Sequence, residues 1–349
     1  MRFYKPHTKF YCGVDMHSRI IYVCIIGEKK EILVHKKINN QDTQQLLDVL
    51  KPYQDNIVVS CESTFAWYWL ADFCNEHGFE FILGHPYYMK SIGSAKVKND
   101  KVDSEKIARL AQAGMFPLAY AYPKENRSLR DLLRRRLYFV EFRAKLLTHI
   151  KILNYQINED TIGRISKITH KQLALLDRFK DEAVRMSVEA NLRLIIFYNK
   201  LINDLEVFIR SKARKHNRKE LCLLQSIHGV GDIIALTILY EVGDINRFEI
   251  IGHFSSYCRL VRCTHESAGK KYGSGGSKIG NPYLKRAFTE AALFVSKFNP
   301  NIEKYFNKMQ SKKGKMKAYC ILGNKLARVV YHMLRTGKVF DEKRFLKGN

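Results

Sequence analysis

The sequence lacks any apolar run approaching the roughly 18 residues that a membrane-spanning helix needs. Its longest apolar stretches, around residues 20–26 and 233–239, have the length of core segments. The N-terminus also lacks the apolar segment and small-residue cleavage site of a signal peptide. The eight cysteines form no CxxC pair, as is usual for reduced thiols. We therefore expect a cytoplasmic protein with no membrane partner.

Acidic residues are scarce. The chain has 34 Asp and Glu against 60 Lys and Arg, which gives a net charge of +26. Residues 1–120 carry 15 basic and 13 acidic side chains, whereas the rest of the chain carries 45 and 21. A strongly cationic protein usually binds a polyanion, either nucleic acid or an acidic membrane surface. A chain of 349 residues is long enough for two or three domains. We therefore expect the chemistry in residues 1–120 and the polyanion-binding surface in the remainder.

Residues 1–120 have the pattern of an α/β domain. Runs of β-branched and aromatic residues predict strands, and apolar residues spaced by three and four predict helices. The predicted strands cover residues 9–15, 20–26, 31–38, 57–61 and 79–83. The predicted helices cover residues 41–50, 65–76 and 101–112. The resulting order, βββαβαβα, is that of the ribonuclease-H-like (RuvC-like) fold.

Four acidic residues stand at special positions of this pattern: Asp15, Glu62, Asp100 and Asp103. Asp15 ends the first strand and Glu62 the fourth, and these strands are neighbours in a sheet of that topology. Asp100 and Asp103 are three residues apart and share a helix face. Carboxylates gathered beside phosphates usually hold Mg²⁺, which suggests an enzyme that cuts or joins nucleic acid. Helix capping by Asp100 and a favourable dipole position for Asp103 are the structural alternatives.

Residues 121–220 predict a helical middle region. No proline and almost no glycine occurs between residues 124 and 219, and the apolar spacing is that of long helices packed as a hairpin or coiled coil. Such a pair is a common dimerisation device. The basic runs at 134–136 and 212–219 either contact phosphates or form solvated helix faces.

Residues 221–349 predict a mainly helical C-terminal domain. Gly229 and Gly231 lie between two apolar helices, as in a helix-hairpin-helix motif whose backbone N–H groups bind phosphate. A simple helix–turn–helix corner is the alternative.

A glycine- and lysine-rich segment, 267–288, precedes an amphipathic helix in this C-terminal region. It has no Walker A pattern, but it can approach phosphate closely. Ser267, Ser274 and Ser277 each qualify as a nucleophile at phosphorus. A flexible linker is the alternative interpretation.

In order and spacing, these motifs resemble transposases of the IS110 family, including its IS1111-like members, over almost the whole chain. The resemblance rests on GVDMHSR at 13–19, CES at 61–63, KNDKVDSEKIA at 98–108, and the segments 227–239, 266–271 and 275–288. It maps the family's DEDD acids onto Asp15, Glu62, Asp100 and Asp103, and its nucleophilic serine onto Ser267. In many members glycine directly follows that serine. Here Ala268 follows it, so Ser274 stays an alternative.

The resemblance implies a recombinase that cuts and rejoins DNA through a phosphoserine intermediate. Its Mg²⁺-dependent site would combine the acids of one protomer with the serine of another, in a dimer or tetramer associated with the nucleoid. A structured non-coding bridge RNA would select donor and target DNA. Two alternatives remain: a Holliday-junction-type nuclease that uses the same acids with water, and a non-catalytic nucleic-acid-binding regulator.

Overall fold

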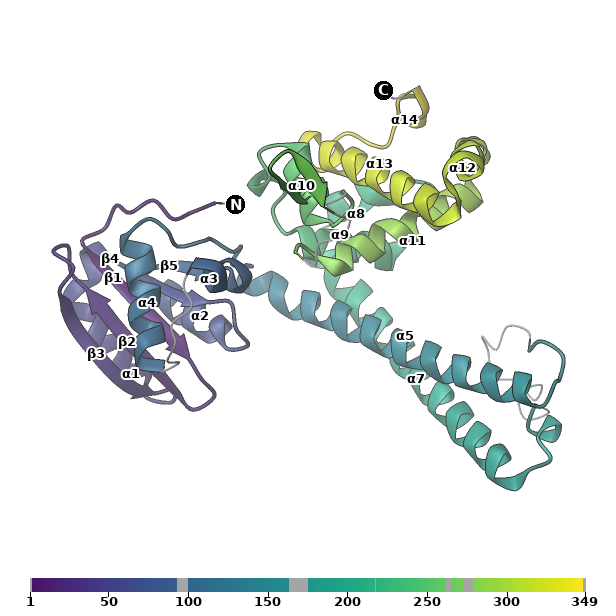
Figure 1. Ribbon diagram of the computed structural model, residues 1–349, viewed down its shortest axis with the longest axis horizontal. Coiled ribbons are helices and arrows are strands. Elements are labelled where there is room, and N and C mark those ends of the chain that lie inside the picture. Colours follow the sequence, from purple (N-terminus) through teal and green to yellow (C-terminus); the bar gives the residue numbers. More distant parts are fainter. Residues whose placement is uncertain are drawn as a thin grey trace. The chain divides into compact units, whose positions relative to one another are not determined.

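Contacts within the chain define two compact units, Met1–Lys124 and Glu125–Asn349. The structure is a computed structural model, shown in Figure 1. It describes residues 2–92, 100–162, 175–216, 218–261, 265–272 and 279–347. Within these ranges, no helix is both long enough and apolar enough to cross a membrane.

Unit Met1–Lys124 contains a five-stranded mixed sheet in the order β3-β2-β1-β4-β5. The strands are β1 (Phe10–Met16), β2 (Ile20–Ile26), β3 (Ile32–Asn39), β4 (Ile57–Glu62) and β5 (Glu80–Gly84). β1 pairs antiparallel with β2 and parallel with β4, which pairs parallel with β5. The five strands and the adjacency of β1 and β4 are thus as predicted. Val14 is paired with Cys61, so Asp15 and Glu62 follow on neighbouring strands at the same edge.

Helices cover both faces of this sheet (Figure 1). The helical segments are α1 (Thr43–Leu50), the 3₁₀ turn η1 (Lys51–Asn56), α2 (Trp67–Glu76), α3 (Pro86–Ile92) and α4 (Asp100–Gln112). Apolar residues of α1 and α2 form one core with the sheet, and those of α3 and α4 form a second. The sequence pattern does not predict α3, because this seven-residue helix buries only Met89 and so has no apolar periodicity.

The backbone of α4 packs directly on β1 at Gly13. A Cβ atom at Gly13 would lie 2.1 Å from the Ser104 carbonyl oxygen and 2.4 Å from the Ala108 nitrogen. His35 on β3 adds a hydrogen bond from Nε2 to the Lys101 carbonyl oxygen, at 2.9 Å. Glycine at position 13 therefore allows the first turns of α4 to lie against the strand that carries Asp15.

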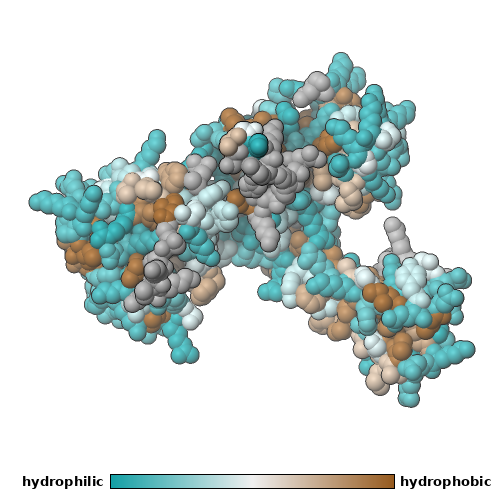
Figure 2. Space-filling model, viewed as in Figure 1, coloured by the Kyte–Doolittle hydropathy of each residue, from teal (hydrophilic) through white to brown (hydrophobic). Residues whose placement is uncertain are grey.

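Unit Glu125–Asn349 includes a long helical hairpin made by α5 (Lys124–Gln156) and α7 (Glu182–His216), with the 3₁₀ turn η2 (Leu176–Arg178) between them. Arg136 on α5 forms an ion pair with Glu206 on α7, at 2.6 Å. The hairpin also exposes large apolar side chains, such as Tyr155 and Phe197, and brown patches mark its surface in Figure 2.

The rest of this unit is mainly helical. Its elements are α8 (Arg218–Gln225), α9 (Asp232–Val242), η3 (Ile245–Arg247), α10 (Ile251–Tyr257), the strands β6 (His265–Ser267) and β7 (Lys270–Tyr272), α11 (Pro282–Phe298), α12 (Pro300–Lys313), α13 (Lys315–Thr336) and α14 (Glu342–Lys347). Buried residues such as Leu236, Phe288 and Leu326 pack α9, α11 and α13 into one core. A mixed α/β sheet domain, followed along the chain by a mainly helical remainder, is what the sequence predicts.

One buried carboxylate connects α5, α9 and the start of α11. Glu241 is 1% exposed and accepts hydrogen bonds from Arg134 Nη2 at 2.8 Å, Arg130 Nε at 3.1 Å and Asn281 Nδ2 at 2.7 Å. Burial alone would raise the pKa of Glu241, but its arginine and asparagine partners lower that pKa below the ordinary value. Asn281 Oδ1 in turn accepts the Leu284 N–H at the N-terminus of α11. The network therefore fixes the start of α11, the helix that follows the glycine-rich stretch carrying Ser267.

Replacing Gly13 with alanine should destabilise unit Met1–Lys124 by about 1–3 kcal/mol, because the methyl group would overlap the α4 backbone. Urea unfolding followed by tryptophan fluorescence measures this directly, since both tryptophans lie on α2 in this unit. The control is Gly27→Ala, for which the three atoms nearest to the added methyl group all belong to the flexible Glu31 carboxylate. An equal effect of the two substitutions would contradict the close packing of α4 on β1.

Replacing Glu241 with alanine should destabilise unit Glu125–Asn349 by about 3–5 kcal/mol, because two largely buried arginines lose their shared carboxylate. Since the folded-state pKa of Glu241 is lowered, its contribution is present above the unfolded-state pKa and is lost as pH falls through the folded-state value. Unfolding followed by circular dichroism checks both effects. The control is Glu189→Ala, which removes a surface ion pair with Arg193 and should cost less than about 1 kcal/mol.

Candidate active site

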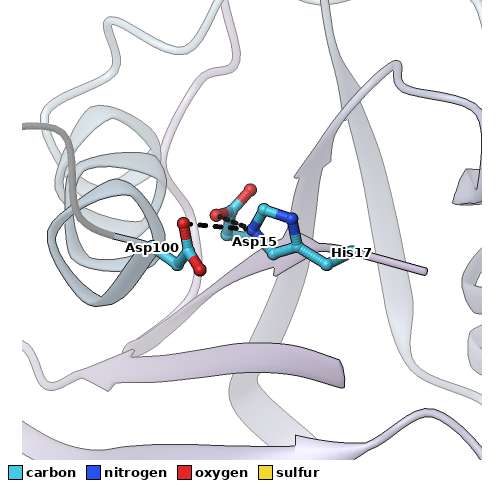
Figure 3. A group of neighbouring side chains, drawn as sticks. All are labelled: Asp15, His17 and Asp100. Carbon is cyan, nitrogen blue, oxygen red and sulfur yellow. Dashed lines mark hydrogen bonds and ion pairs between the residues drawn. The ribbon is translucent and has the colours of Figure 1, made fainter. Parts of the chain in front are cut away.

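Asp15, His17 and Asp100 meet at the carboxyl end of β1 (Figure 3). His17 Nε2 lies 3.1 Å from Asp15 Oδ2 and 3.3 Å from Asp100 Oδ1. Asp15 comes from β1, His17 follows that strand, and Asp100 is the first residue of α4. The three potential ligand atoms all lie within 4.8 Å of one another, and no other such group of His, Cys, Asp or Glu occurs among the residues described.

Glu62 and Asp103 lie near this group and interact with it electrostatically. Burial raises the pKa of Asp15; His17 opposes this increase, whereas the charges of Asp103 and Asp100 add to it. Burial also raises the pKa of Glu62. The charge of Lys90 opposes this increase, whereas the charges of Asp15 and Asp103 add to it. Asp103 therefore acts on both strand-end acids. The fold brings the four predicted acids into one electrostatic cluster, although only Asp15 and Asp100 belong to the tight group with His17.

His17 is the site residue that the sequence interpretation missed. Its backbone is held on both sides: its N–H donates to the Ile20 carbonyl oxygen at 3.0 Å, and its own carbonyl oxygen accepts from Asn40 Nδ2 at 2.7 Å. The sequence feature that could have identified His17 is its position two residues after Asp15. Residues two apart along an extended backbone point to the same side, so an Asp-x-His pair at a strand end can present two ligands together.

The group has the donor types and spacing that a divalent cation requires. Neighbouring ligands of an octahedral ion with bonds of about 2.1 Å lie about 3 Å apart. The distances of 3.1 and 3.3 Å from His17 Nε2 to the two carboxylates are close to that separation. Half-buried carboxylates that repel one another also gain from a cation between them. The described residues therefore fit a metal ion.

Ser267 belongs to the other unit, Glu125–Asn349, and ends β6 instead of lying in an irregular loop. Its backbone pairs with Lys270 of β7 across a tight turn formed by Ala268 and Gly269, whose φ angles are 50° and 73°. The start of the predicted glycine-rich loop is therefore a β-hairpin. Ala268 occupies a turn position that favours glycine. Ser274 and Ser277 lie outside the described residues.

The two glycines between α8 and α9 have different surroundings. Gly229 has a φ of 99°, and a Cβ atom there would lie 2.9 Å from the Val295 nitrogen, so this turn packs against α11. A Cβ atom at Gly231, which precedes α9, would have no atom within 4 Å. A pocket of about 350 Å³ nearby is lined in part by Arg210 and Arg218. Packing therefore explains Gly229, and phosphate binding by this corner stays a prediction.

Comparisons with known proteins agree with these motifs. The family model described as "Transposase" for the DEDD region of IS110 elements matches residues 12–154, and the model "Transposase IS116/IS110/IS902 family" matches residues 222–307. The two matches are consecutive and together cover well over half of the chain.

Several whole-length relatives are transposases of insertion sequences. The transposase of element IS1111A from Coxiella burnetii is 25% identical over 92% of this chain and 88% of its own length. That of IS1533 from Leptospira borgpetersenii is 24% identical over 81% of this chain and 84% of its own length. That of IS1328 from Yersinia enterocolitica is 21% identical over 95% and 98%. The chain thus belongs to the IS110 family of insertion-sequence transposases.

Proposed function

We propose that this transposase cuts and rejoins DNA at a metal-dependent site held by an RNase H-like (RuvC-like) domain. The observation that carries this proposal is the convergence of the four acids at one sheet edge. The order β3-β2-β1-β4-β5, with β2 antiparallel to β1 and with β4 and β5 parallel to it, supports the RNase H-like assignment. Asp15, Glu62, Asp100 and Asp103 would hold Mg²⁺ or another divalent ion.

The acids and the serine would divide the chemistry between them. A bound divalent ion supplies charge stabilisation to a reacting phosphate. The Ser267 hydroxyl would lose its proton and attack phosphorus, forming an Oγ–P bond. The bond from phosphorus to the leaving strand oxygen breaks, and that oxygen takes up a proton, so the number of protons is unchanged. Attack by a strand-end hydroxyl on the phosphoserine reverses these changes and rejoins DNA. Because one phosphate ester replaces another, no outside energy source is needed.

The partners in this proposal are DNA, a structured RNA and further copies of the chain. The excess of basic residues after residue 120 suits DNA and a structured bridge RNA, whose phosphates the helical parts would contact. In this proposal residues 1–120 form the RuvC-like domain, 121–220 a dimerising coiled coil and 221–349 the serine-bearing domain. A dimer or tetramer would let the serine of one protomer meet the acids of another. Such an enzyme would act on DNA in the cytoplasm, at the nucleoid.

Neutralising Glu62 as Glu62→Gln should reduce metal-dependent strand transfer by a factor of about 100 or more, because metal-held charge stabilisation is worth several kcal/mol. Binding to DNA, which rests on basic side chains, should change little. Strand-transfer and salt-dependent binding assays on the same preparation check this. Equal loss of both would contradict a separate metal site.

The same variant should be more stable than the parent in metal-free buffer at pH 7. The folded-state pKa of Glu62 is raised, so its ionised form destabilises the fold, and this cost disappears as pH falls below the unfolded-state pKa. Thermal unfolding of both proteins from pH 7 to pH 4 measures the difference. A constant difference across that range would argue against the raised pKa.

Ser267→Ala should abolish a covalent protein–DNA adduct that the parent protein forms with a nicked or suicide substrate. Denaturing gel electrophoresis detects the adduct, and Ser311→Ala, a serine on α12, is the control. Ser274→Ala tests the alternative nucleophile. If Ser267→Ala still cleaves DNA and neither the parent nor any variant forms an adduct, the enzyme is a hydrolytic nuclease.

A further inference from the structure

Between the two carboxylates of the candidate site lies an imidazole that the DEDD assignment does not include. His17 Nε2 is 3.1 Å from Asp15 Oδ2 and 3.3 Å from Asp100 Oδ1, so one nitrogen faces both acids (Figure 3). The backbone of His17 is fixed by Ile20 and Asn40, which limits how far the ring can move away. This nitrogen therefore lies where a metal bound by the acids would meet it.

We propose that His17 is a third protein ligand of the metal site, with Asp15 and Asp100, and that it shifts the site's preference from Mg²⁺ toward Mn²⁺. This inference rests on the proposed metal-dependent function. Mg²⁺ strongly prefers oxygen ligands, whereas an imidazole nitrogen suits transition-metal ions. Two carboxylates with one imidazole form a mixed set that Mn²⁺, Fe²⁺, Co²⁺ and Zn²⁺ all accept; of these, Mn²⁺ also replaces Mg²⁺ readily at carboxylate sites and is the ion used in the test below.

The pair His7–Glu80 offers a comparison for His17, because it has one imidazole and only one carboxylate. His7 Nε2 also contacts a carboxylate, Glu80 Oε2, at 2.9 Å, and both belong to the same unit as His17. No third ligand joins His7 and Glu80 within the described ranges. An imidazole–carboxylate contact alone is an ordinary ion pair, whereas His17 completes a three-donor group. His7→Ala is therefore the control for His17→Ala.

The test measures metal binding by the full-length protein, not its activity. Mn²⁺ affinity is determined by electron paramagnetic resonance of the free ion, and Mg²⁺ affinity by competition with Mn²⁺. His17→Ala should weaken Mn²⁺ binding about tenfold or more, as loss of a metal-site partner does, and weaken Mg²⁺ binding less than about threefold. His7→Ala should change neither affinity. Thermal unfolding confirms that the variants are folded.

A spectroscopic measurement tests the nitrogen ligand itself. Pulsed electron paramagnetic resonance of Mn²⁺ bound to the parent should show coupling to an imidazole nitrogen, and His17→Ala should lose it. Absence of this coupling in the parent protein would overturn the inference. Tighter binding of both ions by His17→Ala would also overturn it, because the imidazole would then occupy the position that the metal ion takes. The variant Asp15→Asn separates failure of this inference from failure of the proposed function. If Asp15→Asn abolishes metal binding while His17→Ala leaves metal binding unchanged, the metal-dependent function stands and His17 is not a ligand.

Discussion

The contact between the α4 backbone and β1 at Gly13 is the constraint on which the candidate site depends. Asp15 ends the strand, and Asp100 and Asp103 occupy the first turn of the helix, so their separation is set by how closely the two elements approach. Any side chain larger than hydrogen at position 13 would overlap the helix. The carboxylates consequently repel one another inside a half-buried edge, and a cation bound between them would relieve that repulsion.

The two units divide physical tasks differently. The first has nearly balanced charge and brings four of its acidic residues together at one edge, where they are electrostatically coupled. The second carries most of the positive charge, yet it uses part of that charge internally, since Arg130 and Arg134 neutralise the buried Glu241. A basic composition therefore overstates the charge available to nucleic acid. The same network holds Asn281, which begins the helix after the serine-bearing segment.

Much of this architecture follows from local sequence signals. Alternating and continuous apolar runs gave the five strands to within a residue or two, and strand order placed Asp15 beside Glu62. Helix α3 was not predicted, because a helix that buries a single residue, Met89, has no apolar periodicity. The sequence pattern did not single out His17, because a single histidine after a strand has no periodicity. Its place in the candidate site depends on Asp100, which is distant in sequence. The hairpin at Ser267 was not predicted, because the surrounding sequence is rich in glycine and lysine, as is typical of loops.

In the proposed function, the edge formed by β1, β4 and the start of α4 holds a divalent ion. Crystals of the full-length protein grown with Mn²⁺ would test it most directly, by anomalous diffraction at the manganese absorption edge. The account predicts an anomalous peak within bonding distance of carboxylate oxygens of Asp15 and Asp100. A map with ordered acids, fully available Mn²⁺ and no peak between them would contradict it.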